Sequence, residues 1–262
     1  HELDPEYARH LKAAFQKCRQ PIAGLLQNYG RYETIAGKQY PQWLIHKTGS
    51  DAAAELILGL AEFLKCEYDQ QLADYTCKLA EGIIAMQIDD GSNFHGAFLS
   101  WPDLWHAWGN AQTQALTSIG LVLDRPRFIQ AAQKEADHYY AYLLSDGMKN
   151  SWWYSKTDTI EEFPQIAYDI RCMTVGLLRL YEATADIKYA KMAGDAASWL
   201  VGHNAAGQVM YESKTGRCLD GINAKSEVNL NSGAESTIEA LLTLVEIKHS
   251  GLELQDSNIV LF

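Results

Sequence analysis

An internal repeat constrains the fold of this 262-residue chain more than any other feature of its sequence. Three apolar segments share a glycine followed by a leucine, and these glycines are Gly59, Gly120 and Gly176. They lie 61 and 56 residues apart, and a fourth apolar segment, 240–245, follows about one period later without the glycine. Self-similarity at a fixed period is typical of repeated structural units that stack on one another.

Each of the first three apolar segments is followed by a short break and a second segment. In these second segments, 71–86, 128–144 and 189–201, apolar residues recur at three- and four-residue steps, with charged residues opposite. The first segment of each pair is nearly apolar all round, as in a helix packed on both sides. An inner ring of helices inside an outer ring satisfies both patterns. The sequence therefore predicts an all-α fold, an α/α toroid with about four inner and four outer helices and small loop hairpins.

The segments at the two ends of the chain fit the same plan. Residues 5–27 have the pattern of an outer helix, and residues 233–250 have the pattern of an inner helix. Together they provide the fourth pair. We therefore expect residues 1–262 to form a single α/α-toroid domain, which is either a closed ring of four pairs or a fragment of a longer toroid.

Composition and charge argue against several classes of function. A net charge of −11 opposes binding to nucleic acid and gives no attraction to anionic membranes. No apolar run is long enough to cross a bilayer. The first residues lack the basic and apolar regions of a signal peptide, although a processed start would look the same. The five cysteines form no CxxC motif, and unpaired cysteines slightly favour a cytoplasmic location.

Tryptophans are concentrated in the connections of the predicted toroid. The connections between pairs are long, 89–108, 145–165 and 202–232, and long ordered loops in a compact domain are usually functional. Flat rings near solvent suit sugars, because the apolar faces of pyranose rings stack on them. One tryptophan could equally cap the helical core, but a group of them favours a glycan site. Six of the seven tryptophans lie in connecting segments: Trp43, Trp101, Trp105, Trp108, Trp152 and Trp153.

Carboxyl groups in and beside the same loops provide the candidate catalytic residues. Glycoside hydrolysis needs one carboxyl group to protonate the leaving oxygen and a second one across the cleft. Asp169 stands in an apolar helix, where an unpaired charge is costly, and the alternative role is an ion pair with Arg171 or Arg179. Glu235 has an alternative role in a helix-capping box with Ser232. The four candidates are Asp103, Asp169, Asp220 and Glu235.

Aromatic, amide and cationic side chains near these carboxyl groups are candidates for substrate binding. The alternative chemistry of a lyase would use a base such as His106 or Tyr168, with Arg171 or Asn110 neutralising a uronate carboxylate. The candidate binding residues are Trp101, Trp105, His106, Trp108, Asn110, Trp152, Trp153, Tyr168, Arg171 and Asn231.

Two stretches of the C-terminal part resemble a known superfamily. One runs over 210–221 and continues over 229–237, and the other comprises 168–171 followed by 176–184. Both are similar to the six-hairpin (α/α-toroid) glycosidase-like domains of bacterial glycan-processing proteins. The resemblance implies a glycoside hydrolase or polysaccharide lyase fold, and some members have no established activity. The chain departs from that pattern in having about four helix pairs rather than six.

We therefore expect a glycoside hydrolase-like protein whose partner is an oligosaccharide or polysaccharide. A non-catalytic module that binds glycans or proteins is the first alternative, and a polysaccharide lyase or epimerase acting on uronic sugars is the second. The histidines show neither HxH nor HExxH spacing, so we expect no metal site. The sequence has no glycine-rich phosphate loop and no nucleophile elbow, and we expect no cofactor.

Overall fold

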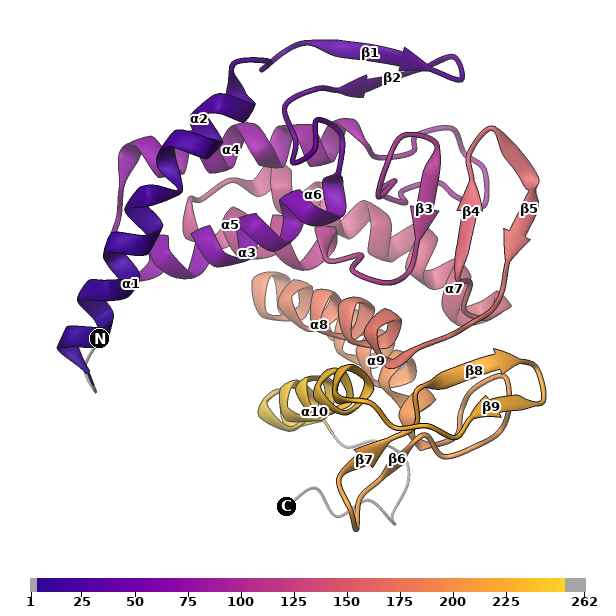
Figure 1. Ribbon diagram of the computed structural model, residues 1–262. Helices are drawn as coiled ribbons and strands as arrows, with labels where there is room; N and C mark the ends of the chain where they lie inside the picture. Colours follow the sequence, from indigo (N-terminus) through magenta and orange to yellow (C-terminus); the bar gives the residue numbers. More distant parts are fainter. Residues whose placement is uncertain (1–3, 253–262) are drawn as a thin grey trace.

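The structure of the chain, a computed structural model, describes residues 4–252, except for the side chains of residues 157 and 158. Within this part, a row of four helices forms the inner layer, and each helix packs on the next (Figure 1). Eleven of the eighteen residues of the third of these helices are buried, which explains its apolar sequence. The four helices are α3 (Ser50–Cys66), α5 (Gln112–Val122), α8 (Ala167–Thr184) and α10 (Ala234–His249).

The outer layer packs against this row, as the periodicity predicts. The predicted outer helix 128–144 consists of three pieces, because a π-helical turn interrupts it where the loop 94–98 lies against it. The predicted helix 5–27 is also divided, and Pro21 just after the break cannot donate a backbone hydrogen bond. The outer helices are α1 (Pro5–Lys17), α2 (Arg19–Leu26), α4 (Gln70–Ala85), α6 (Pro126–Lys134), the π-helix (Glu135–Tyr140), α7 (Ala141–Asp146) and α9 (Ile187–Ala197), which ends in a 3-10 turn (Ser198–Val201).

The short breaks within pairs carry the signals that start an outer helix. The Asp69 carboxylate accepts a hydrogen bond from Leu72 N at 3.0 Å and so caps α4. The Asp186 carboxylate accepts one from Lys188 N at 3.0 Å and caps α9. Pro126 occupies the first position of α6, where no backbone donor is needed.

The repeated glycines allow helices to approach closely at two of the three positions. A Cβ atom added at Gly176 of α8 would lie 3.0 Å from the Thr113 side chain of α5. A Cβ atom at Gly120 of α5 would lie 2.7 Å from Ile129 of the outer helix α6. At Gly59 the nearest atom would be 3.9 Å away, which is ordinary contact. The glycines of the repeat therefore serve two different close contacts. Gly176 lies between the inner helices α8 and α5, and Gly120 lies between the inner helix α5 and the outer helix α6.

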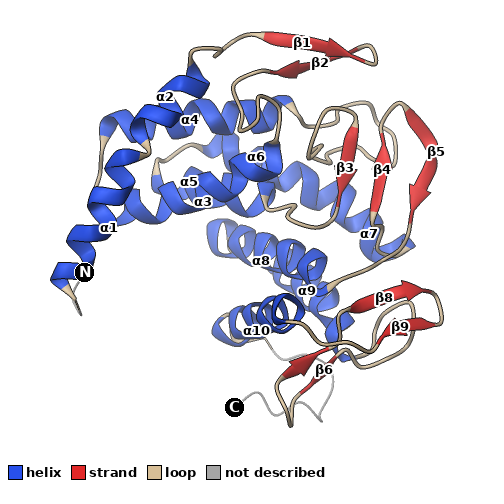
Figure 2. Cartoon of the chain, in the orientation of Figure 1, coloured by secondary structure: helices blue, strands red, loops and turns tan. Residues whose placement is uncertain are grey.

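Short antiparallel strands lie in the segments that lead into the inner helices (Figure 2). Three of the sheets in the described part are two-stranded, and β3, β4 and β5 form a three-stranded sheet in which Trp105 pairs with Trp152. Small loop hairpins, predicted from the sequence, are thus present. The strands are β1 (Tyr32–Ile35), β2 (Lys38–Pro41), β3 (Leu104–His106), β4 (Ser151–Trp153), β5 (Lys156–Glu161), β6 (Tyr211–Glu212), β7 (Arg217–Cys218), β8 (Gly221–Ala224) and β9 (Glu227–Asn229).

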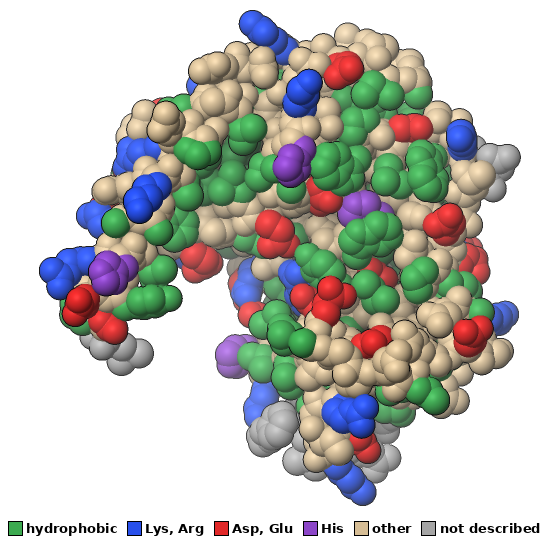
Figure 3. Space-filling view, in the orientation of Figure 1, with side chains coloured by type: hydrophobic (Ala, Val, Ile, Leu, Met, Phe, Trp, Pro, Cys, Tyr) green, Lys and Arg blue, Asp and Glu red, His purple; other side chains and the backbone are tan. Residues whose placement is uncertain are grey.

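Over residues 4–252 the inner row is an open arc. Helices α3 and α10 stand at its two ends, with α5 and α8 between them, and the surface is hollowed between the N-terminal helices and the C-terminal part (Figures 1 and 3). The all-α, toroid-type architecture predicted from the repeat is confirmed. The described residues do not form a closed ring of four pairs, which was one of the two arrangements that the sequence allowed. No helix in this part is long and apolar enough to cross a membrane.

Candidate functional site

Asp51, the second residue of α3, contacts the loop that leads to α5. Its Oδ2 atom accepts a hydrogen bond from Trp101 Nε1 at 3.1 Å and lies 3.3 Å from His106 Nε2. The other ring nitrogen of His106, Nδ1, lies 2.7 Å from the carbonyl oxygen of Trp108 and donates to it, because a carbonyl only accepts. Asp51 and His106 thus form a carboxyl–imidazole pair in which the carboxyl group faces the Nε2 atom.

Trp108 covers this pair and is open to solvent. Its ring lies parallel to the His106 ring, with centroids 4.0 Å apart and planes at 7°. It is 36% exposed, whereas His106 beneath it is 4% exposed. The Trp101 ring, which bonds to Asp51, stacks with His46 at 6.1 Å. An exposed aromatic face beside this carboxyl–imidazole pair is a suitable platform for a sugar ring.

Arg171, in the second turn of α8, connects the inner helices. Its Nε donates to Glu239 Oε2 of α10 at 2.6 Å, and its Nη1 donates to Gln114 Oε1 of α5 at 3.4 Å. Its Nη2 lies 3.9 Å from Glu55 Oε1 of α3, and its guanidinium lies over the Tyr168 ring at 5.0 Å. Because Arg171 reaches α3, two helices away along the row, these groups lie on the concave side of the arc.

The charges around Arg171 and those around Asp51 act on one another. Burial raises the pKa of Glu55; Arg171 opposes this shift, and the charges of Glu239 and Asp51 add to it. The side chain of Glu55 is 48% exposed, so the group is accessible. The site is therefore one electrostatic unit, which we call the inner-face cluster: Asp51, Glu55, His106, Trp108, Arg171 and Glu239.

Tyr168 holds the loop and α8 together within this unit. A Cβ atom at Gly109, where φ is +66°, would lie 3.3 Å from the Tyr168 hydroxyl, so the loop passes directly against the phenol. Burial raises the pKa of Tyr168 to about 12. Tyr168 therefore keeps its proton at neutral pH and can act there as a hydrogen-bond donor.

Two of the four predicted catalytic carboxylates are engaged in loop structure. Asp103 accepts hydrogen bonds from the backbone N and the hydroxyl of Ser155, at 2.7 and 2.6 Å, and so joins the turn before β3 to the β4–β5 turn. Asp220 accepts from Gly233 N at 2.6 Å and from Ser236 Oγ at 2.7 Å, and so joins the β7–β8 turn to the start of α10. The catalytic roles predicted for Asp103 and Asp220 stay predictions. The hydrogen bonds in the structure give both residues a role in holding loops in place.

Asp169 and Glu235 differ from expectation in their local roles. Asp169 is 7% exposed, and its Oδ2 accepts from Ile166 N at 2.9 Å at the start of α8. The alternative role considered for Asp169, an ion pair with Arg171 or Arg179, was wrong. Arg171 pairs with Glu239, and Arg179 pairs with Glu182 and Glu246. The capping box of Glu235 with Ser232 was also wrong, since Gly233 is the N-cap of α10. Glu235 is exposed in the first turn of that helix, and its charge helps to raise the pKa of Asp169, after burial.

The predicted binding residues form two groups, apart from the two asparagines. Trp101, His106, Trp108, Tyr168 and Arg171 meet in or beside the inner-face cluster. Trp105 and Trp152 instead pack with Phe94 and Tyr139 in what we call the loop core, and Trp153 lies half-buried beside them on β4. Asn110 is buried with its amide near His106 O, whereas Asn231 is exposed and accepts from Asp220 N through its backbone oxygen. Trp43, which bonds to Lys78 O, is also buried.

Sequence reasoning missed Asp51, Glu55, Gln114 and Glu239. They lie in the first two turns of inner helices, where a polar residue looks like an ordinary solvated position. One signal was available. Asp51 and Glu55 are four residues apart, as are Glu235 and Glu239, so each pair shares one face of its helix.

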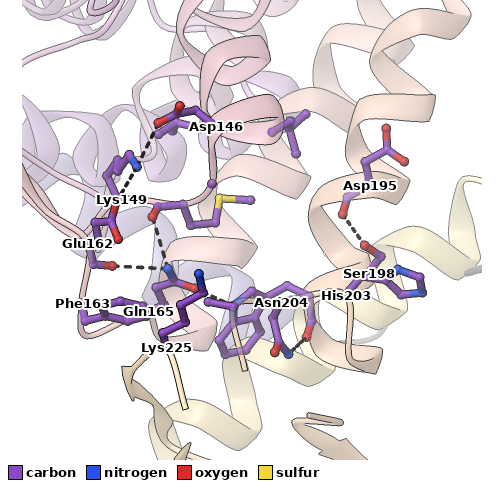
Figure 4. A pocket seen from close by; sticks show the side chains of 16 residues that line it. Asp146, Lys149, Glu162, Phe163, Gln165, Asp195, Ser198, His203, Asn204 and Lys225 are labelled. Carbon is purple, nitrogen blue, oxygen red and sulfur yellow. Dashed lines mark hydrogen bonds and ion pairs between the residues drawn. The ribbon is translucent and has the colours of Figure 1, made fainter. Parts of the chain in front are cut away.

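A separate cavity of about 570 Å³ opens between α7, the end of α9 and the β8–β9 turn (Figure 4). In its wall the Lys149 ammonium group lies 3.0 Å from both Asp146 and Glu162. None of the inner-face cluster lines this cavity. Among the described residues, no group of three or more His, Cys, Asp or Glu side chains is arranged to hold a metal ion.

Comparison with known proteins gives no match by sequence and clear matches by structure. No protein-family profile and no curated protein matches the chain. A GH76 α-mannanase of Bacteroides thetaiotaomicron matches 93% of the chain with a TM-score of 0.61 at 13% identity. Cellobiose 2-epimerases of Spirochaeta thermophila and Bacillus thermoamylovorans match 90% and 76% of it, with TM-scores of 0.58 and 0.56 at 12% and 13% identity.

These solved structures belong to longer chains. The present chain spans 64% of the mannanase and 64% and 53% of the two epimerases. All three are α/α toroids of the six-hairpin type, so the resemblance found in the sequence is confirmed for the fold. At 12–13% identity the likeness concerns the fold alone.

Proposed function

We propose that this chain is a carbohydrate-active, glycoside hydrolase-like protein that binds an oligosaccharide or polysaccharide on the concave side of its arc. The observation that carries this proposal is the arrangement around Arg171, which contacts carboxyl groups from both end helices of the row, Glu55 and Glu239. A single guanidinium separates these groups, so their oxygens lie inside the upper limit of about 9.5 Å for the paired carboxyl groups of glycoside hydrolases. Trp108 beside them offers an exposed ring for a sugar face.

The environments of the two carboxyl groups suit different tasks. The raised pKa of Glu55 favours the protonated form, which a group that protonates the leaving oxygen needs. Glu239 is paired with Arg171 at 2.6 Å, and this ion pair requires a carboxylate, the form that a base or nucleophile needs. Glu235, a predicted catalytic residue, lies one turn before Glu239 on α10 and remains a further candidate for the second role.

The test begins with a panel of neutral and uronic oligosaccharides, read by new reducing ends and by absorbance at about 235 nm for lyase products. Glu55→Gln keeps the shape of the side chain but removes the acid, and we expect turnover to fall about 10²–10⁴-fold with bound sugar retained. Glu62→Gln is the matched control, since Glu62 lies on the same helix and is 69% exposed. Equal turnover in the two variants contradicts the assigned role of Glu55.

The same panel separates the alternatives from different classes. Binding without any product indicates a non-catalytic glycan-binding module and rejects the enzyme. Absorbance at about 235 nm would indicate a lyase acting on uronic sugars. The geometry favours neutral sugars, because Glu239 already occupies Arg171 and the carboxylates around it would repel a uronate.

Epimerisation is a second candidate, supported by the Asp51–His106 pair. Epimerising a sugar beside its carbonyl carbon needs a group that removes and returns a proton, and histidine is the commonest residue for such transfer. A product that incorporates solvent deuterium without new reducing ends would indicate this reaction. In that case Asp51→Asn is expected to lower the rate more than Glu55→Gln does, and the reverse order favours hydrolysis.

A further inference from the structure

Behind the inner-face cluster, the loop that carries His106 packs on α8 around a small cavity. Its volume is about 20 Å³, and most of its wall is apolar, including Leu143, Met148 and Met173. Tyr140 and Lys149 also line it, but their polar atoms are engaged, by Glu135 and by Asp146 and Glu162. Three more polar residues complete the wall. Trp105, Asn110 and Asp169 line the cavity and are only 1%, 3% and 7% exposed.

Each of these three residues has one buried polar atom without a hydrogen-bond partner among the described residues. These atoms are Trp105 Nε1, Asn110 Oδ1 and Asp169 Oδ1. The other polar atoms of the two acceptors are engaged: Asn110 Nδ2 donates to His106 O at 3.4 Å, and Asp169 Oδ2 accepts from Ile166 N at 2.9 Å. Leaving one buried polar atom unpaired costs about 1–3 kcal/mol. Three such atoms around one cavity therefore indicate a shared ligand.

We propose that this cavity binds a single water molecule, which accepts a hydrogen bond from Trp105 Nε1 and donates to Asn110 Oδ1 and Asp169 Oδ1. The volume fits, because a bound water needs roughly 10–15 Å³ and two to four polar partners. A metal cation would meet the N–H group of Trp105, and chloride would meet two oxygen acceptors. Only a molecule that both donates and accepts satisfies all three atoms.

The water also fits either protonation state of Asp169. Burial raises the pKa of this carboxyl group to about 8, with the charge of Glu235 adding to the shift, so both states occur near neutral pH. Water donates to the carboxylate and accepts from the protonated acid. The hydrogen-bonded network therefore persists when Asp169 gains or loses its proton.

This water connects the loop that carries His106 and Trp108 to the helix that carries Arg171. On one side Asn110 bonds to the backbone of His106, and on the other Asp169 begins the helix that positions Arg171. The cavity shares Leu143, Met148 and Lys149 with the larger cavity of Figure 4, so the two cavities adjoin. The proposal does not depend on whether the chain acts on sugars.

Water-selective magnetisation transfer in the full, isotope-labelled chain tests the proposal at the Trp105 indole N–H. We expect a cross-peak between this proton and water, and Trp105→Phe identifies the resonance by removing it. Trp43 is the control, since it is 3% exposed and its Nε1 donates directly to Lys78 O at 2.8 Å. No cross-peak is expected there. A wild-type chain without a cross-peak at Trp105 overturns the proposal.

Variants and a crystal structure locate the water. Asp169→Asn retains an acceptor and is expected to keep the cross-peak, whereas Asn110→Leu removes one and fills the space, and is expected to lose it. An unchanged cross-peak in folded Asn110→Leu protein contradicts the assigned position. At high resolution the wild-type crystal should show one density peak within hydrogen-bond distance of all three atoms. A direct bond between Trp105 Nε1 and either oxygen, or a bound ion, would overturn the proposal even if Asn110→Leu does not fold.

Discussion

Trp105 and Trp108 lie three residues apart in one loop, and the fold gives them opposite environments. Trp105 is 1% exposed and stacks with Trp152 in the loop core, at a centroid distance of 5.8 Å. Trp108 is 36% exposed and stacks on His106 of the inner-face cluster. Trp105 and His106 are neighbours on β3, where successive side chains point to opposite faces. The Trp105 ring therefore points into the loop core, whereas the His106 ring points into the candidate site, where Trp108 stacks on it.

The carboxyl groups of the two regions differ in the same way. Glu135, in the π-helix beside the loop core, is fully buried, and its oxygens accept from Phe98 N at 2.9 Å and Thr113 Oγ1 at 2.7 Å. Glu55 in the inner-face cluster is 48% exposed, and its contact with Arg171 is long, at 3.9 Å. Burial raises the pKa of both groups. A raised pKa alone therefore does not mark a candidate reactive carboxyl group; the group must also be accessible to solvent, as Glu55 is.

The largest effect that separates the two regions is expected from Trp152→Ala. Trp152 is fully buried, stacks with Phe94 at 4.1 Å and donates to Tyr139 Oη at 2.7 Å. Truncating such a side chain leaves a cavity and should lower the free energy of unfolding by about 3–5 kcal/mol. Urea denaturation followed by far-UV circular dichroism measures this loss. A loss below about 1 kcal/mol, the size expected of a surface position, would show that the loop core is not a core.

The fold was readable from the sequence because its signal is repeated and long. The apolar inner helices, the amphipathic outer helices and the breaks capped by Asp69 and Asp186 each appear in local sequence, and they agree with one another. The π-helix at Glu135 was not readable, because it depends on the packing of the distant loop 94–98. Tertiary contacts of this kind leave no periodic trace.

The candidate site was only partly readable. The loops indicated Trp101, His106 and Trp108 as one group, since the three lie within eight positions of the chain. Glu55 and Glu239 were missed because they stand 184 positions apart in the chain, and only the folded arc brings both of them to Arg171. Sequence also failed to separate Trp105 from its neighbours, because a three-residue strand is too short for its alternation to be recognised.

An intermediate effect is expected from the pH dependence of stability, through Glu135. Burial raises the pKa of this carboxyl group from 4.5 to about 7, so the folded state binds its proton more tightly than the unfolded state does. Its contribution to stability is therefore full below about pH 4.5 and is lost as the pH rises to about 7, by about 3 kcal/mol in total. Glu135→Gln removes this dependence and keeps the shape of the side chain.

Urea denaturation of the wild type and of Glu135→Gln at several pH values measures the contribution of Glu135. Between pH 5 and pH 8 the unfolding free energy of the wild type should fall relative to that of Glu135→Gln. Asp169, whose pKa is also raised, is common to both proteins and cancels in this difference. A difference that stays constant over this range would mean that Glu135 keeps the same charge in the folded and unfolded states.

The smallest effect tests the other side of the comparison, through Trp108→Ala. Because Trp108 is 36% exposed and packs mainly on His106, its removal should change the melting temperature by no more than a few degrees. A sugar that stacks on its ring should bind about fivefold more weakly, which corresponds to about 1 kcal/mol. Tyr68→Ala is the matched control, since Tyr68 is 64% exposed and lies at the opposite end of the helices, between α3 and α4. Calorimetry with a sugar that the wild type binds measures both variants, and equal affinities would remove Trp108 from the binding surface while leaving the Asp51–His106 pair beneath it as a candidate.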